Sequence, residues 1–272
     1  MKLCKYWDAA ETTAPDATGK ILKLRKWGGS NTSLEDAQRQ ACAALDALVA
    51  GLGARVFRGH DYSYSMREVP EELVQEISDT AGVTRNARGC LVLNTADAFF
   101  ADIDIPEPGF FARLFGASKE KAEQAALSKL RTFIAAHPGA GARIYRTRAG
   151  LRYLFTHAPV PMSEESIGWL EALGSDKLYV RLCKNQKCYR ARLTPKPWRI
   201  GCGAIAGHYP YRRPEHAEGF RNWLRDYEEK CRAHATCSLV GTEGETRLHP
   251  ALSPIVTLHD KLCRIHEPLP LA

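Results

Sequence analysis

The sequence predicts an α/β protein in which helices pack on a mixed, largely antiparallel sheet built from hairpins. Stretches that alternate as strands do and stretches with helical periodicity interleave along the 272 residues. Several neighbouring strands are separated only by short turns, which connect antiparallel rather than parallel pairs. An apolar fraction of 44% and a charged fraction of 25% are typical of a globular chain with a buried core.

The expected elements follow in chain order. Residues 21–27 alternate as a strand does, and Ser33 with Asp36 three positions later begins a helix that extends to about residue 50. The remaining elements are a helix from Pro70, a hairpin over 83–95, a strand over 99–105, a helix from Ser118 to about 137, a hairpin of 142–147 with 151–157, a helix over 163–173, a basic hairpin over 178–193, and helices over about 214–233 and 250–264.

We expect these elements to form three parts. They are an N-terminal α/β unit over 1–82 packed on the core, a metal- and phosphate-binding core over 83–212, and a helical extension over 213–272. No window approaches the roughly 18 consecutive apolar residues that a membrane span needs, and the first residues lack the apolar core of a signal peptide. We therefore expect a cytoplasmic protein with no membrane partner.

The residue composition also bears on the chemistry. The nine cysteines are expected to be reduced, and most of them to be buried as small apolar side chains. No phosphate-binding Walker loop, dinucleotide-binding glycine motif or nucleophile elbow occurs in the sequence. ATPase, nicotinamide-dependent and serine-hydrolase chemistry are therefore not expected.

The positive charge is concentrated in one segment. Between Gly141 and Arg199 there are twelve Lys and Arg residues against four Asp and Glu, an excess that accounts for the whole net charge of +7. A concentrated positive field favours a polyanionic ligand, and a solvated basic face is the alternative.

Asp102 and Asp104 are the strongest candidates for a metal site. Residues two apart on a strand point to one face about 6.6–7 Å apart, so both carboxylates can converge on Mg²⁺ or Mn²⁺. The preceding Phe99, Phe100 and Ala101 indicate a buried strand, where unpaired carboxylates are costly. The alternative is a pair of aspartates neutralised by arginines or exposed at a sheet edge. Asp176 is either a third carboxylate for the ion or a turn residue.

Basic residues on the following hairpins are candidate phosphate ligands, because guanidinium groups fit phosphate oxygens in two-point contacts. Gly150 allows a tight turn between the arginines at positions 146, 148 and 152. His157 adds another donor or simply meets a backbone carbonyl. A later basic stretch is expected to line a nucleic-acid groove or to face solvent; its residues are Arg190, Arg192 and Lys196.

The order of these motifs resembles the archaeo-eukaryotic primase (primase-polymerase) superfamily: a strand ending in hydrophobic-Asp-x-Asp, a helix, a hairpin with a glycine turn and basic residues, and a later aspartate. The resemblance covers about residues 83–199 and extends to Arg181-Leu182-Cys183, which is similar to a stretch near the third acid in some branches. Where the family has a serine and, two residues after the glycine, a histidine, this chain has Thr147 and Arg152.

The resemblance implies a primase-polymerase-like core with roles for particular residues. The acids that would hold the catalytic metal ions are Asp102, Asp104 and Asp176. The residues that would bind the phosphates of the incoming nucleotide are Arg146, Arg148, Arg152, His157 and Arg181. The resemblance therefore implies a nucleotidyltransferase that uses Mg²⁺ or Mn²⁺ and binds nucleotides and DNA or RNA.

Other functions remain open at the level of sequence. One is a metal-dependent phosphoesterase or nuclease on the same acids, and another is a catalytically inactive nucleic-acid-binding protein. Zinc is a further cofactor that the cysteines allow, because Cys183 and Cys188 flank an expected four-residue turn, with Cys202 and His208 downstream. Cys231 and Cys237 offer a second arrangement.

Overall fold

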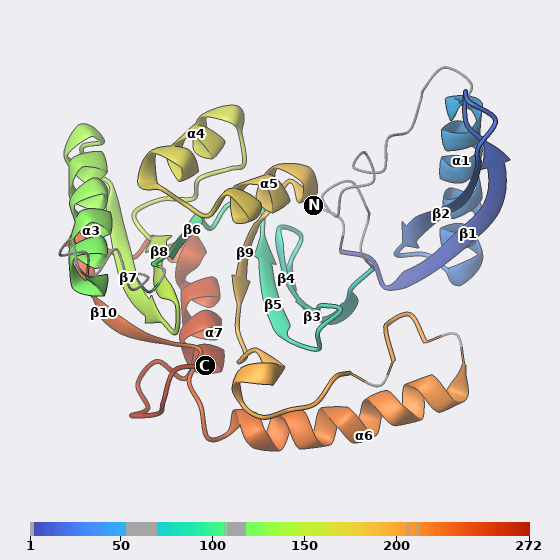
Figure 1. Ribbon diagram of the computed structural model, residues 1–272. Coiled ribbons are helices and arrows are strands. Elements are labelled where there is room, and N and C mark those ends of the chain that lie inside the picture. The colour runs from blue at the N-terminus through green and yellow to red at the C-terminus, as the bar shows by residue number, and fades with distance from the viewer. Residues whose placement is uncertain (1–2, 53–69, 106, 108–117, 206, 212) are drawn as a thin grey trace.

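The computed structural model describes residues 3–52, 70–105, 107, 118–205, 207–211 and 213–272, and it confirms an α/β fold with helices packed on antiparallel sheets (Figure 1). The first four-stranded sheet has the strand order β10–β7–β8–β6, formed by Cys237–Gly244, Gly141–Thr147, Gly150–Phe155 and Phe100–Asp104. The second has the order β3–β4–β5–β9, formed by Glu72–Ser78, Ala81–Arg85, Leu91–Thr95 and Tyr189–Arg192.

The two sheets meet at β6 and β9, which are their edge strands and contact each other. Buried residues of both sheets belong to one hydrophobic core that also includes residues of four helices. These helices are α3 Lys119–Ala136, α4 Glu164–Leu173, α5 Lys177–Gln186 and α7 Ser253–Cys263. In Figure 1, α7 lies near the centre of the body, where the two sheets meet.

Serine side chains fix the start of three of the expected helices. Ser33 accepts a hydrogen bond from the backbone N–H of Asp36, and Ser118 caps α3 in the same way. Ser163 forms a reciprocal capping box at the start of α4. The hairpins predicted over 83–95 and 142–157 are also confirmed, as the antiparallel pairs β4–β5 and β7–β8.

The N-terminal unit has a small core of its own. It consists of β1 Tyr6–Pro15, β2 Ile21–Ser30 and α1 Leu34–Ala50. The helix lies so close to β2 that a Cβ on Gly28 would be 2.1 Å from the carbonyl oxygen of Ala37, which explains the glycine. The larger body begins before residue 83, because β3 is already hydrogen-bonded to β4.

Two predicted elements were wrong. The helix expected from Pro70 is instead β3, an edge strand of the second sheet. The basic hairpin expected over 178–193 is α5 followed by β9. A helix forms there because Asp176 caps it and because Val180 and Cys183, three residues apart, both face the core.

The C-terminal part contains the two expected helices and one strand that was not predicted. The helices are α6 Pro214–Cys231 and α7, which follows a short 3-10 turn over Pro250–Leu252. The unpredicted strand is β10, which pairs with β7. None of the helices in the described ranges is long and apolar enough to cross a membrane.

Candidate metal and phosphate site

Three aspartates converge where β6 ends and α5 begins; we call Asp102, Asp104 and Asp176 the acidic triad. Ile103 lies between the first two, so their carboxylates share one face of β6, the face on which Phe100 contacts His259 of α7. The backbone N–H of Asp176 donates to the carbonyl oxygen of Asp102 at 3.0 Å, which brings the third acid beside the strand. Burial and the charges of Asp102 and Asp176 raise the pKa of Asp104.

Asp176 also has a structural role. Its side chain accepts a hydrogen bond of 2.8 Å from the backbone N–H of Tyr179 and so caps α5. Tyr179 in turn donates its hydroxyl to the carbonyl oxygen of Phe100 at 2.8 Å, which ties α5 to β6. The two roles considered for Asp176 are therefore compatible, since one carboxylate caps the helix and adds charge to the triad.

Basic side chains face the triad; we call Arg148, Arg192, Lys196 and Arg199 the cationic arc. Burial and the nearby charges of Arg192 and Arg199 lower the pKa of Lys196, while Asp102 and Asp104 act in the opposite direction. Burial and Arg148 lower the pKa of Arg199, which Asp104 partly offsets. Arg192, Lys196 and Arg199 are thus close to acids of the triad as well as to another positive charge, and Arg148 is close to Arg199.

Like charges are crowded on both sides of this site. Asp102 and Asp176 disfavour the ionised form of Asp104, and neighbouring arginines disfavour the charged forms of Lys196 and Arg199. A divalent cation would relieve the repulsion within the triad, and an anion would relieve the repulsion within the arc. The arrangement is therefore suited to a metal ion bridged to phosphate oxygens.

Arg199 was missed as a site residue by the sequence analysis. It ends a short 3-10 turn over Pro197–Arg199 that follows β9, and its backbone N–H donates to the carbonyl oxygen of Lys196. The run Pro-Lys-Pro-Trp-Arg is the signal that could have found it, because two prolines place the flanking cations in a rigid turn.

Arg152 on β8 is the cross-strand partner of Asp102 and is only 3% exposed. Its Nε is 3.7 Å from Asp102 Oδ1, and its Nη1 donates to the carbonyl oxygen of Arg192 at 3.0 Å. Nη1 is also 3.3 Å from Nε2 of His259 on α7. Burial lowers the pKa of Arg152, but the charge of Asp102 and of nearby groups outweighs burial, so the pKa is raised. This arginine is placed to orient Asp102 rather than to meet a ligand from solvent.

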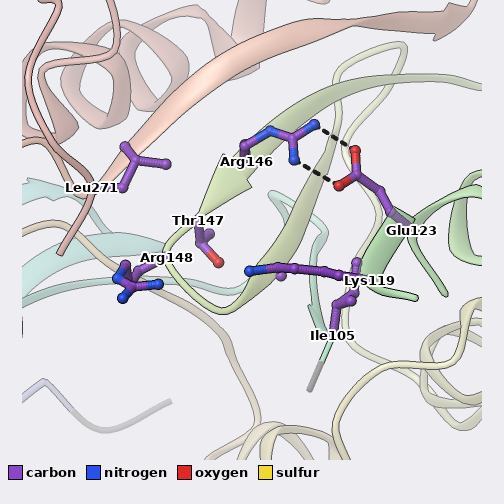
Figure 2. A pocket seen from close by; sticks show the side chains of 8 residues that line it. Ile105, Lys119, Glu123, Arg146, Thr147, Arg148 and Leu271 are labelled. Carbon is purple, nitrogen blue, oxygen red and sulfur yellow. Dashed lines mark hydrogen bonds and ion pairs between the residues drawn. The ribbon is translucent and has the colours of Figure 1, made fainter. Parts of the chain in front are cut away.

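A cavity of about 300 Å³ adjoins the end of β6 (Figure 2). Its lining includes Gly150, the partner of Asp104 in the β6–β8 pair. Arg146 donates two hydrogen bonds to Glu123 there and is partly neutralised by it. Figure 2 shows the Lys119 side chain extending toward Thr147, with Arg148 on the other side of Thr147. None of the acidic triad lines this cavity, because Arg146 shares the face of Ile103 and lies on the opposite side of the sheet from Asp102 and Asp104.

Other predicted site residues are not brought to the triad. The Nδ1 of His157 meets the backbone of Gly141, in agreement with the structural alternative considered for it. Arg190 forms an ion pair with Glu71 at 2.7 Å, with side chains only 16% and 12% exposed. Arg181 is exposed on α5.

The cysteines named for zinc lie in different surroundings. Cys183 and Cys188 are buried, and burial raises the pKa of Cys183 to about 12. Cys202 belongs to a separate hydrophobic cluster, and its thiol donates to Asp226 at 3.5 Å. The sequence prediction of a site shared by all three has no geometric support here.

A different group with metal-binding side chains occurs at the junction of the two sheets. Cys237, His259 and Cys263 are buried, and their ligand atoms all lie within 4.8 Å of one another. A hydrogen bond from the Cys263 thiol, together with His259 and Arg152, lowers the pKa of Cys237. The sequence analysis named Cys237 only together with Cys231 and did not find this group, because its members come from β10 and α7.

Comparisons with protein-family models, with curated proteins and with solved structures give no match to this chain. The primase resemblance therefore stays a prediction, and the function is inferred from the site itself.

Proposed function

We propose that this chain is a primase-polymerase-like nucleotidyltransferase that acts on nucleotides and DNA or RNA and depends on a divalent metal ion. One observation carries the proposal: the acidic triad and the cationic arc lie side by side, each crowded with like charge. Such an arrangement is expected where a metal ion and a polyphosphate bind together.

The triad fits a hard divalent cation. Asp102, Asp104 and Asp176 supply carboxylate oxygens, which Mg²⁺ and Mn²⁺ prefer. The raised pKa of Asp104 reflects burial and the repulsion by Asp102 and Asp176, and such a cation would offset both. When bound, the metal would activate a hydroxyl nucleophile and neutralise charge on the phosphoryl group. Arg152 would hold Asp102 in place for this role.

The arc fits the anionic part of a nucleotide. Lys196 and Arg199 would bind phosphate oxygens and stabilise the charge that develops on them during transfer. Phosphate binding would raise the pKa of Lys196 toward its usual value, because it compensates the repulsion by Arg192 and Arg199.

An exposed aromatic side chain beside the arc is consistent with a nucleic-acid ligand. Trp198 is 52% exposed, and the charged groups of Arg88 and Lys196 lie 4.9 and 5.6 Å from its ring centroid. Exposed aromatic rings flanked by cations are the usual platform on which single-stranded bases stack.

The test is an extension assay with a labelled primer on a template, nucleoside triphosphates and Mn²⁺. We expect the wild-type chain to lengthen the primer, and Asp102→Asn and Asp104→Asn to lower the rate at least about 100-fold, the scale of losing a group that stabilises developing charge. Asp79→Asn, which changes an exposed aspartate in a turn, is the control and should keep the wild-type rate.

Other outcomes identify the alternatives. A primer that becomes shorter in a triad-dependent way would indicate a nuclease or phosphoesterase. Binding of single-stranded DNA that survives Asp102→Asn, weakens in Arg199→Ala and is not accompanied by turnover would indicate a binding protein. Either result would refute the proposed transferase.

A further inference from the structure

We propose that the chain binds one structural Zn²⁺ ion through Cys237, His259 and Cys263, at the junction of the two sheets. The site is separate from the acidic triad and does not depend on the proposed function. Of the cysteines that the sequence indicated for zinc, it uses only Cys237.

The three side chains have the placement of a metal site. His259 and Cys263 are four residues apart on α7, so they lie on one face of the helix. Cys237 begins β10 and approaches that face, and the three ligand atoms are within 4.8 Å of one another. All three residues are fully buried, with 0% exposure. Two thiolates and one imidazole from two elements form a donor set that zinc favours.

Asp260, which is itself held by Tyr145, orients the imidazole of His259. Its Nδ1 lies 3.0 Å from Oδ1 of Asp260, which also accepts a hydrogen bond of 2.8 Å from the hydroxyl of Tyr145. Asp260 is held further by an ion pair with Arg143 at 2.8 Å. A proton on Nδ1 leaves the lone pair on Nε2, as in the carboxylate–histidine–metal arrangements of zinc proteins.

The guanidinium group of Arg152 lies next to these three ligand side chains. Nη1 of Arg152 lies 3.3 Å from Nε2 of His259 and donates to the carbonyl oxygen of Arg192 at 3.0 Å. That carbonyl is also 3.8 Å from Sγ of Cys263 and is the candidate for a fourth ligand. A zinc ion would bind Nε2 of His259 and the carbonyl oxygen of Arg192 in place of their hydrogen bonds with Arg152. Arg152 would keep its contact with Asp102.

The charges support a closed zinc site. Two thiolates balance a divalent ion, so occupation adds no net charge to this buried region. Thiolate and imidazole ligands select zinc over Mg²⁺ or Mn²⁺, which prefer oxygen ligands. The two metal sites of the chain would therefore differ in the ion that they bind.

The first test measures metal on the wild-type chain, so it does not depend on whether a variant folds. Purified, reduced protein is dialysed against metal-free buffer and analysed for zinc, and the stripped protein is titrated with Co²⁺. We expect about one zinc per chain, as for other closed sites, and thiolate-to-cobalt absorption that saturates at one equivalent. A chain that contains no zinc and shows no such absorption would overturn the proposal.

Variants then assign the ligands. Cys263→Ser and His259→Gln should each lose most of the bound zinc, whereas Cys183→Ser and Cys188→Ser, which change buried cysteines elsewhere, should retain it. Far-UV circular dichroism checks that each variant keeps its fold, and the cobalt spectrum of His259→Gln should shift even where affinity is only reduced. Zinc that is lost in Cys183→Ser but kept in Cys263→Ser would also overturn the assignment.

Discussion

Replacing Asp104 by asparagine should make the metal-free protein more stable. The burial and like charge that raise the pKa of Asp104 mean that its ionised form destabilises the folded state. Two unit charges about 6.7 Å apart, the spacing of alternate strand residues, repel by about 0.6 kcal/mol in water and about 2.5 kcal/mol at an effective dielectric constant of 20. Because the Asp102 side chain is 39% exposed, a gain near the lower end is expected, about 1 kcal/mol.

The assay is thermal unfolding in the presence of a chelator and then of Mn²⁺. A gain of about 1 kcal/mol corresponds to a rise in Tm of about 2–4 °C for a chain of this size class. Mn²⁺ at about 100 times its Kd should stabilise the wild type by about 2.7 kcal/mol and the variant far less, so the order of the two proteins reverses. Asp79→Asn should change neither value.

The gain in stability from Asp104→Asn should depend on pH in a defined direction. Asp104 has a folded-state pKa above its usual value of 3.8, so the folded state holds this proton more tightly than the unfolded chain does. The advantage of Asp104→Asn should therefore be absent well below pH 3.8 and appear as the pH rises through the folded-state pKa. A variant that is less stable than wild type in chelator at neutral pH, or that keeps the full Mn²⁺ stabilisation, would refute the reasoning.

Three further predictions test neighbouring features. Asp176→Asn should keep the cap of α5 but lose the Mn²⁺ shift in Tm, whereas Asp176→Ala should also lose about 1 kcal/mol of stability; equal behaviour of the two variants in chelator would argue against the cap. Gly150→Ala should lower the free energy of unfolding in urea by about 1–3 kcal/mol through overpacking, because its Cβ would lie 1.9 Å from the carbonyl oxygen of Ile103; an unchanged midpoint would contradict this. Glu71→Gln should cost about 3–5 kcal/mol in the same assay, since it leaves the buried charge of Arg190 unpaired, and a double-mutant cycle with Arg190→Met should recover part of the loss.

The features that could be predicted from the sequence are those that local residue patterns determine. The alternation around Ile103 gave the shared face of Asp102 and Asp104, and serine caps and short turns gave the starts of helices and the hairpins. These features depend on neighbours within a few residues, which the sequence displays directly.

The errors came from segments whose structure depends on distant partners. The segment of α5 contains basic and apolar residues that fit a strand as well as a helix, and its helical form is decided by Asp176 and by packing against the core. β10 becomes a strand by pairing with β7, from which it is separated by most of the C-terminal half. Position along the chain gives no indication of such pairings.

The same limit applies to the candidate site. Asp176 could be named in advance, but its approach to Asp102 follows from the way α5 starts beside β6. The arc forms because β9 lies against β6, which brings Lys196 and Arg199 across from the triad. Cys263 and His259 could be paired by their spacing, but Cys237 could not be added without the sheet.

The position of Arg152 has a consequence for the order of folding. Its guanidinium joins Asp102 on β6, a carbonyl of β9 in the other sheet and His259 on α7, which is 107 residues away in sequence. Contacts of such long range form late, because the intervening chain must first be ordered. During synthesis, the acids on β6 would therefore acquire their final orientation only after α7 had left the ribosome, so a product interrupted before α7 would carry the carboxylates without that orientation.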